Sequence, residues 1–510
     1  MKIKNCCPIS KVEDEPENEK NLRIPIPINR RRLASLFLIG YFYLQIVKKG
    51  FRVKFFISPA VSILFMYSFL FAQPAALRSG PMVGYGQMTE VMLWVQTTKP
   101  VAVQYLYWDT SGPNDKQKSI SITTSEAEAY TARTVISGLQ PGRSYGYELL
   151  IEGKPVKRNY PLRFQTQSNW QWRTDPSDFT AAFGSCAYVN EKGYDRPGRE
   201  YGGDYKIFAA IASKQPDLFL WGGDNVYYRE RDWDTRSGLI HRNEYTRALP
   251  EMQPLLGAAH NYAIWDDHDY GPNDADRSYR LRETSLEIFK LFWANQTYGT
   301  GETPGIFGRF IWNDVEFFLL DDRYHRSPNK SPNDSIKTMF GKAQLQWLKD
   351  ALSNSAGNAF VSFRVIMNGN QMLNTNGEYN ESLTQFSNEY NELILYIKQN
   401  SIPGIIFLSG DRHFTEMISL RDSSFYPLYE YTSSALTSGM NTLKDSNGNP
   451  TGEFYNPLRV EGTLVTDEHN FGMLKFSGKQ KDRAVALECY DAAGALRWSK
   501  KIKASELKAK

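Results

Sequence analysis

The sequence has little of several features that would point to particular protein classes. It contains only 4 cysteines in 510 residues, which excludes a small scaffold held together by disulfides. It has no internal repeat and no low-complexity tract, so a solenoid and a disordered polymer are both excluded. Its 6 histidines leave few candidates for acid–base or metal chemistry. The length exceeds one ordinary hydrophobic core and predicts two domains with additional segments.

The sequence also lacks an excess of basic charge once its first 72 residues are set apart. Residues 1–72 contain 12 Lys and Arg against 5 Asp and Glu. Residues 73–510 contain 48 basic and 51 acidic residues, a net charge of −3. The formal charge of +4 for the whole chain therefore comes from its N-terminal part, and we expect no nucleic-acid-binding patch on the remainder.

The N-terminal part is typical of a targeting segment. Residues 55–72 carry no charge, and Lys48, Lys49, Arg52 and Lys54 precede them, as in a signal peptide cleaved after Ala72. The apolar run is also about as long as the shortest membrane-spanning helices, so an uncleaved anchor remains an alternative. We expect an exported protein, whether periplasmic, secreted or attached to the cell envelope, whose membrane contact is confined to this segment.

Two differently patterned regions follow. Residues 78–168 contain short runs rich in Val, Tyr, Leu and Thr separated by turn residues, which predicts a small all-β domain. Within it, GLQPGRSYGYELLIEGK at 138–154 resembles fibronectin type III and immunoglobulin-like modules. After a linker at 169–177, residues 178–500 alternate apolar strands with helical patterns, which predicts an α/β domain. The helical patterns cover residues 204–214, 280–295, 342–354 and 388–400.

Polar residues with metal-ligand chemistry follow most of the apolar strands of the α/β region. In chain order they are Cys186; Asp224 and Tyr227; Asp266, Asp267, His268, Asp269 and Asn273; Asp321, Asp322 and Arg323; Asn368 and Asn370; and Asp411, Arg412 and His413. Functional groups collect where parallel strands end, so we expect several of these side chains to meet. Carboxylate, imidazole, thiolate, phenolate and amide groups together predict a metal site.

Each motif alone has a simpler interpretation. Gly-Gly-Asp at 222–224 is a common turn, and a buried Cys186 could serve as a small hydrophobic residue or pair with Cys489. The WDDHD motif at 265–269 is harder to explain by packing, because three carboxylates around one histidine repel each other unless exposed or bound to cations. The joint occurrence of the motifs predicts a metal site more strongly than any single motif does.

The motifs GSC, GDNVYY, WDDHD and SGDRHF, in this order, resemble the alkaline phosphatase D (PhoD-like) branch of the calcineurin-like metallophosphatases. The resemblance covers about residues 78–500. It implies a metallophosphatase-type β-sandwich flanked by helices and preceded by the small all-β domain. The sequence departs from the general superfamily pattern as this branch does, with Cys186, Tyr227, Asp267 and Asp411 standing where other ligand types occur.

Carried over by position, the resemblance implies a two-metal site with Asp224 bridging the metals. Cys186, Tyr227 and His413 would hold one metal, and thiolate and phenolate ligands suggest Fe(III). Asp267 and Asp411, together with Asn273, would hold the other, and oxygen ligands suggest Ca²⁺. The implied activity is phosphoester hydrolysis, in which metal-bound hydroxide attacks phosphorus.

Three further residues receive roles at this site. His268 would protonate the leaving group or stabilise its charge. Asp269 would orient His268. Arg323 would contact phosphate oxygens, with a surface ion pair to Asp321 or Asp322 as the alternative.

Several functional alternatives remain open at this point. A phosphodiesterase or phospholipase D-type hydrolase would use the same ligands, because the pocket above the metals sets substrate choice. Tyr228, Trp233 and Tyr270 could line that pocket or simply pack loops. A catalytically inactive cell-envelope binding protein is a second alternative. The long polar stretch at 438–463 is either a lid or a surface loop.

Overall fold

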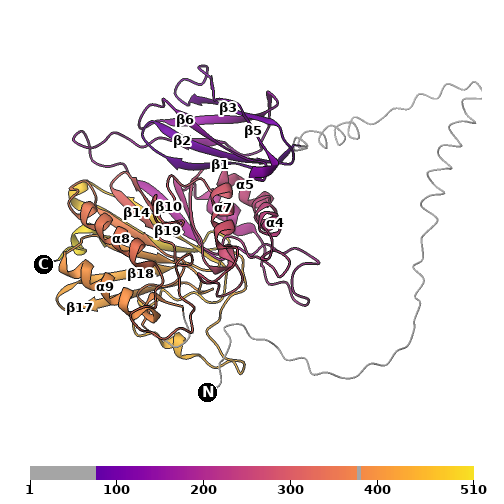
Figure 1. The fold of residues 1–510 in the computed structure, drawn as a ribbon. Coiled ribbons are helices and arrows are strands. Elements are labelled where there is room, and N and C mark those ends of the chain that lie inside the picture. Colours follow the sequence, from indigo (N-terminus) through magenta and orange to yellow (C-terminus); the bar gives the residue numbers. More distant parts are fainter. Residues whose placement is uncertain (1–75, 376–380, 510) are drawn as a thin grey trace, which may run out of the picture. The chain divides into compact units, whose positions relative to one another are not determined.

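A computed structural model describes residues 76–375 and 381–509 of the chain (Figure 1). The signal or anchor segment predicted for residues 1–72 lies outside these ranges. Within them, none of the helices combines the length and the apolar character needed to cross a membrane.

The N-terminal β region forms a small sandwich. One face comes from β1 (Leu77–Gly86), β2 (Glu90–Thr97) and β6 (Thr131–Ser137). The opposing sheet contains β3 (Ala102–Asp109), β4 (Gln117–Lys118), β5 (Ile122–Thr123), β7 (Ser144–Ile151), β8 (Lys154–Pro155) and β9 (Arg163–Gln165). In β2, Val91, Leu93 and Val95 point into a core shared with β3 and β7. The structure therefore confirms the all-β architecture that the period-2 alternation of the sequence predicts.

The small sandwich and the α/β region share one sheet. β1 pairs in parallel with β12 (His260–Ile264), with Val83 opposite His260. Trp94 of β2 points away from the small sandwich, and its Nε1 donates to the Leu291 carbonyl at 2.8 Å. A Cβ at Gly86 would lie 2.4 Å from the His260 ring, so only glycine permits this close approach. The first strand of the described chain is thus built into the larger sheet.

The shared sheet has nine strands, and a second sheet of six strands faces it. The first has the order β21-β20-β19-β10-β11-β12-β1-β2-β6, and the second β13-β14-β15-β16-β18-β17. Besides β1, β2, β6 and β12, the nine-stranded sheet contains β10 (Phe179–Gly184), β11 (Leu218–Gly222), β19 (Asn470–Ser477), β20 (Ala484–Asp491) and β21 (Leu496–Lys503). The second contains β13 (Gly308–Trp312), β14 (Val315–Leu319), β15 (Phe363–Met367), β16 (Ile405–Ser409), β17 (Glu416–Asp422) and β18 (Phe425–Thr432).

Aromatic contacts hold the two sheets face to face. The ring of Phe183 on β10 meets Tyr431 on β18 edge-on at 4.7 Å, and Tyr262 on β12 stacks on Phe310 on β13. The central strands β11, β12, β14, β15 and β16 are buried along their whole length, which explains their continuous apolar sequences. The predicted β-sandwich is confirmed.

Helices cover the outer faces of the sandwich (Figure 1). They are α3 (Lys206–Ser213), α4 (Arg236–Arg247), α5 (Gln253–Leu256), α7 (Arg282–Phe292), α8 (Gly341–Ala356) and α9 (Ser387–Gln399). The four predicted helical patterns correspond to α3, α7, α8 and α9. Each buries an apolar stripe, as Leu286, Phe289 and Phe292 do in α7.

Parallel strands in each sheet bring chemistry to one end of the sandwich. β10, β11 and β12 run parallel in the nine-stranded sheet, and β14, β15 and β16 run parallel in the other. Their carboxyl ends lead directly into the polar motifs that the sequence singles out. The fold therefore gathers these motifs at a shared edge.

Candidate metal centre

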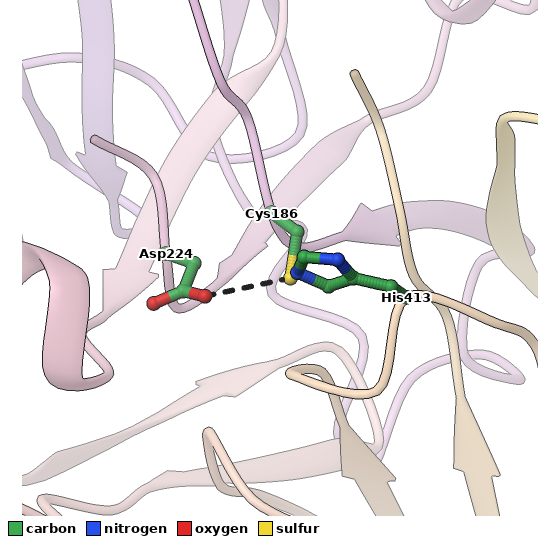
Figure 2. A group of neighbouring side chains, drawn as sticks. All are labelled: Cys186, Asp224 and His413. Atoms are coloured by element: carbon green, nitrogen blue, oxygen red, sulfur yellow. Dashed lines mark hydrogen bonds between the residues drawn. The ribbon is translucent and has the colours of Figure 1, made fainter. Parts of the chain in front are cut away.

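The first group of ligand-type side chains contains Cys186, Asp224 and His413 (Figure 2). One potential ligand atom from each lies within 4.8 Å of the others. Cys186 follows β10, Asp224 follows β11 and His413 follows β16, so the group joins both sheets. The Tyr227 hydroxyl donates to Asp224 Oδ2 at 3.0 Å and lies 3.1 Å from His413 Nε2. The four side chains predicted around one metal therefore lie together.

The second group contains Asp224, Asp267 and His268, again with one potential ligand atom each within 4.8 Å. Asp267 and His268 open the short helix α6 (Asp267–Tyr270), which follows β12. The backbone N–H of His268 donates to Asp267 Oδ1 at 2.9 Å and to Asp224 Oδ1 at 3.3 Å. Because Asp224 belongs to both groups, its carboxylate is placed as a bridging ligand would be.

Burial and like charge dominate the electrostatics around Asp224, whereas at Asp267 the charges of His268 and Arg323 outweigh burial and lower its pKa. The pKa of Asp224 is raised well above its usual value, first by burial and then by the charges of Cys186 and Asp267. Burial likewise raises the pKa of Asp411 to about 6 and that of Cys186 to about 11. Among the described residues, no Lys or Arg forms an ion pair with Asp224 or Asp267.

The donor set fits a bound cation. The buried Asp411 Oδ2 accepts no hydrogen bond within the described chain, and the nearest guanidinium nitrogen, from Arg412, is 3.6 Å away. Burial lowers the pKa of His413, which favours a neutral imidazole that retains a lone pair. Buried acids without matching positive charge are costly unless they bind a cation, so these residues suit a metal better than an empty core.

The backbone of the candidate ligands is held in an unfavourable region. Cys186, Asp224, Asp411 and His413 have φ values of 63°, 53°, 66° and 58°. Residues other than glycine rarely adopt this left-handed conformation, and doing so costs about 1 kcal/mol or more each. Such strain commonly gathers where side chains must be aimed at a functional site.

Ser434, a residue that the sequence analysis missed, connects two candidate ligands. Its hydroxyl accepts the backbone N–H of His413 at 2.9 Å and donates to Cys186 Sγ at 3.1 Å. It follows β18 and is fully buried. A serine after a strand gives no distinctive sequence signal, so only the structure identifies it.

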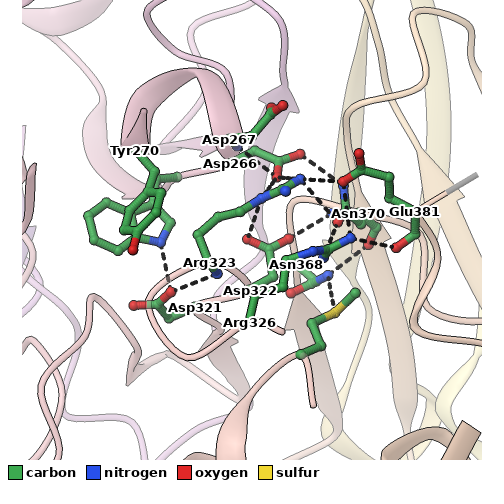
Figure 3. Close-up of polar contacts among 12 residues, drawn as sticks. Asp266, Asp267, Tyr270, Asp321, Asp322, Arg323, Arg326, Asn368, Asn370 and Glu381 are labelled. Carbon is green, nitrogen blue, oxygen red and sulfur yellow. Dashed lines mark hydrogen bonds and ion pairs between the residues drawn. The ribbon is translucent and has the colours of Figure 1, made fainter. Parts of the chain in front are cut away.

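Arg323 lies in a different setting from the one expected (Figure 3). Its side chain is fully buried, with Nε donating to Asp266 Oδ1 at 2.6 Å and Nη2 to Glu381 Oε2 at 2.8 Å. Asn370 Oδ1 accepts a further bond at 3.2 Å. Direct contact with phosphate oxygens is disfavoured, because carboxylates already surround the guanidinium. The alternative of an ion pair with Asp321 or Asp322 is seen in part: Arg323 Nε lies 3.9 Å from Asp322 Oδ1, but the pair is buried and not at the surface.

Asp269 contacts backbone rather than the His268 ring. Its Oδ1 accepts the N–H groups of Asn225 at 2.9 Å and Val226 at 3.3 Å, and its Oδ2 accepts that of Asp266 at 3.0 Å. Burial raises the pKa of Asp269 to about 7. The side chain therefore fixes the loop that carries Asp224, and the predicted contact with His268 is not seen among the described hydrogen bonds.

Asp411 and Asn273 belong to neither of the two groups whose ligand atoms lie within 4.8 Å of one another. The charge of Asp411 contributes to the raised pKa of Asp224 and Cys186, which places it in the same surroundings. Asn273 is exposed, and within the described chain its side chain makes no hydrogen bond. The neighbouring Asp274 N–H instead supports Asp267 Oδ2 at 2.7 Å. Ligation by Asn273 stays a prediction that this placement does not favour.

The structure bears on three further alternatives from the sequence. Cys186 and Cys489 are both free and buried, so a disulfide between them is wrong. Tyr228 and Tyr270 are buried, and Trp233 packs against the main core, which favours the packing role for these aromatics. The 438–463 stretch contacts the site at its start, where the Asn441 N–H donates to the His413 carbonyl at 2.9 Å.

Comparisons with known proteins identify relatives of this chain. The model of the PhoD-like phosphatase family matches residues 182–484, more than half of the chain, and a domain of unknown function, DUF7800, matches residues 74–169. Alkaline phosphatase D of Bacillus subtilis (strain 168) is 23% identical over 414 residues, which cover 69% of this chain and 67% of that protein.

Two solved structures share the fold. A structure of PhoD superposes with a TM-score of 0.66 at 17% identity and covers 84% of this chain and 92% of its own. A purple acid phosphatase, PPD1 from yellow lupin (Lupinus luteus) seeds, gives a TM-score of 0.57 at 12% identity, covering 83% of this chain and 74% of its own. Both similarities concern the architecture that carries the candidate centre.

Proposed function

The chain belongs to the PhoD-like phosphatase family, and from this premise we propose that it is a metal-dependent phosphoester hydrolase of the alkaline phosphatase D type. The observation that carries the proposal is the pair of ligand groups that share Asp224. A carboxylate shared by two buried donor sets would hold two metals close together, as two-metal phosphoryl-transfer sites do.

The donor chemistry supports two different metals. Cys186, Tyr227 and His413, with one oxygen of Asp224, offer sulfur, phenolate and imidazole donors, which suit iron in its ferric state. Asp267 and Asp411, with the other oxygen of Asp224, offer only carboxylates, which suit a hard cation such as Ca²⁺. When bound, the metals would neutralise the phosphate charge and supply an activated water near neutral pH.

The residues of this chain would then orient the substrate and move protons. His268 lies beside both Asp224 and Asp267, and its imidazole ring packs 4.3 Å from the Tyr227 ring. An imidazole in this position can hold a proton on a ring nitrogen and donate it to the departing alkoxide. Asp269 supports this arrangement indirectly, because it holds the loop that carries Asp224. We also propose export of the enzyme, which the N-terminal sequence pattern supports.

The test compares metal-loaded wild-type protein with Asp224→Asn on two chromogenic substrates. We expect wild type to hydrolyse p-nitrophenyl phosphate, and Asp224→Asn to lose both metal and turnover. The ratio of rates on p-nitrophenyl phosphate and bis-p-nitrophenyl phosphate distinguishes a monoesterase from a diesterase. Asp350→Asn on the exposed face of α8 is the matched control and should behave as wild type. Turnover retained by purified Asp224→Asn would refute the proposed centre.

A further inference from the structure

Tyr201 stands at the rim of the first ligand group, in the loop between Cys186 and α3. It is 42% exposed, yet its hydroxyl lies 3.1 Å from His413 Nδ1. Its ring lies 4.9 Å from the Tyr188 ring, 6.1 Å from the imidazole of His413 and 6.4 Å from the Tyr227 ring. Part of this tyrosine therefore faces solvent while its polar end reaches a candidate ligand.

The two ring nitrogens of His413 have different neighbours. Nδ1 faces the Tyr201 oxygen, whereas Nε2 lies 3.1 Å from the Tyr227 hydroxyl, next to Asp224, and 3.4 Å from the Ser438 hydroxyl. The backbone of Gly439 also hydrogen-bonds to the imidazole. A neutral imidazole has one N–H and one lone pair, so the partner of one nitrogen decides the role of the other. A histidine that binds a metal usually donates its second N–H to an outer partner, which fixes both the tautomer and the ring orientation.

We propose that Tyr201 is a positioning residue of the metal centre. Its phenol oxygen accepts the Nδ1–H of His413 and thereby leaves the Nε2 lone pair for the metal held with Cys186 and Asp224. The inference rests on the proposed function only in requiring that this group binds a metal. It assigns to a half-exposed rim tyrosine a role that none of the sequence motifs indicated.

Gly439 offers a second way to disturb the same contact. A Cβ at this glycine would lie 2.8 Å from Cε2 of Tyr201, so the ring can occupy its place only because no side chain is present. The backbone of Gly439 does not adopt the left-handed region, and alanine is therefore conformationally acceptable there. Gly439→Ala should displace the ring while leaving the phenol group chemically intact.

Metal titration gives a readout that does not depend on turnover. Co²⁺ is the probe, because its absorption spectrum reports thiolate and imidazole coordination, and a competing chelator gives the affinity. We expect Tyr201→Phe to bind Co²⁺ about 10-fold to 100-fold more weakly than wild type. Gly439→Ala should weaken binding in the same direction, and it should add nothing in a Tyr201→Ala background. Tyr194→Phe, in the same loop with 47% exposure and its ring beside His241, is the matched control.

The outcomes separate this inference from the proposed function. Wild-type Co²⁺ affinity in Tyr201→Phe would overturn the role of Tyr201, whatever its thermal stability. An additive effect of Gly439→Ala in the Tyr201→Ala background would also overturn it. If wild type binds Co²⁺ but hydrolyses no phosphoester, the proposed function fails while the titration still decides the role of Tyr201. If wild type binds no Co²⁺, the role of Tyr201 in metal binding is overturned, while phosphoester hydrolysis by the metal-loaded enzyme still decides the proposed function.

Discussion

Two buried polar clusters lie side by side at the ends of the strands, and they differ in whether they contain their own positive charge. The ligand cluster, Cys186, Asp224, Asp267 and Asp411, has an excess of acids. The arginine cluster comprises Arg323 and Arg326 with Asp266, Asp322, Asn370 and Glu381 (Figure 3). Adjacent residues of one motif divide between them, because Asp266 pairs with Arg323 whereas Asp267 faces Asp224.

The difference shows how a structural acid can be told from a ligand. Burial alone would lower the pKa of Arg323, but Asp266 and Glu381 outweigh burial and hold that pKa well above its usual value. Buried pairs of this kind depend on both partners, because removing one leaves an uncompensated charge. In the ligand cluster, Asp224 has no such partner in the described chain, whereas the charges of His268 and Arg323 outweigh burial at Asp267 and lower its pKa. We infer that the ligand cluster binds a cation and that the arginine cluster supports the ligand cluster.

The largest expected effect is the loss of bound metal and of activity when the ligand cluster is changed at Asp224. Asp224→Asn should lower kcat/KM by at least about 1,000-fold, because it removes the carboxylate shared by both ligand groups. The same variant should be no less stable than wild type without metal, because it removes a buried charge that lacks a partner. Elemental analysis measures the expected loss of bound metal, kinetics measure kcat/KM, and denaturant unfolding of metal-free protein measures stability. A marked loss of metal-free stability would contradict the division between the clusters.

The second prediction reverses this pattern in the arginine cluster. Arg323→Met should reduce the free energy of unfolding by about 3 to 5 kcal/mol, because Asp266 and Glu381 lose their shared partner. Adding Asp266→Asn should recover part of the loss. Chemical denaturation of metal-free protein checks both. Arg236→Met, which breaks an exposed pair with Glu287 of 2.6 Å, is the control and should cost at most about 1 kcal/mol.

The third prediction concerns chemistry rather than stability. His268→Ala should lower kcat by about 100-fold through loss of proton donation to the leaving group. The loss should be greater for poor leaving groups than for p-nitrophenolate, because a good leaving group needs no proton. Metal content should be retained, which distinguishes an acid from a ligand. His325→Ala, whose ring contacts the Pro304 carbonyl, is the control. Loss of metal from His268→Ala would instead make His268 a ligand.

The most predictable feature of this site was the position of its ligand-type residues at the ends of strands. Cys186, Asp224, Asp267 and His413 each follow an apolar run in the sequence, and parallel strands place such positions at one edge. The orientation of a side chain was not predictable from the same pattern. Asp266 and Asp267 are equivalent in sequence, and their different partners depend on Arg323, 57 residues from Asp266 in the chain.

The arrangement of the N-terminal region shows the same limit. Period-2 alternation predicts its strands, but it cannot show that β1 joins β12 in the larger sheet. That pairing depends on the fit of Gly86 against His260, which is a tertiary contact. Ser434 and Tyr201 were missed for a related reason, because a single hydroxyl carries no periodic or spacing signal. Local patterns thus predict elements, whereas long-range contacts decide partners.

The smallest expected effect is on the pH dependence of the unfolding free energy, which tests Glu381 of the arginine cluster. Burial raises the pKa of Glu381, but Arg323 and Arg326 outweigh it, so the pKa lies below its usual value of 4.5. Folding therefore gains stability from ionised Glu381 above about pH 4.5 and loses it as the pH falls further. Glu381→Gln should cost about 2 kcal/mol at pH 7. The difference in unfolding free energy from wild type should narrow as the pH falls below 4.5 and close only at the strongly lowered folded-state pKa of Glu381. Denaturant midpoints at several pH values, with the exposed Glu392→Gln as control, measure this convergence. Parallel pH profiles would show that the two arginines do not depend on Glu381 for their charge balance.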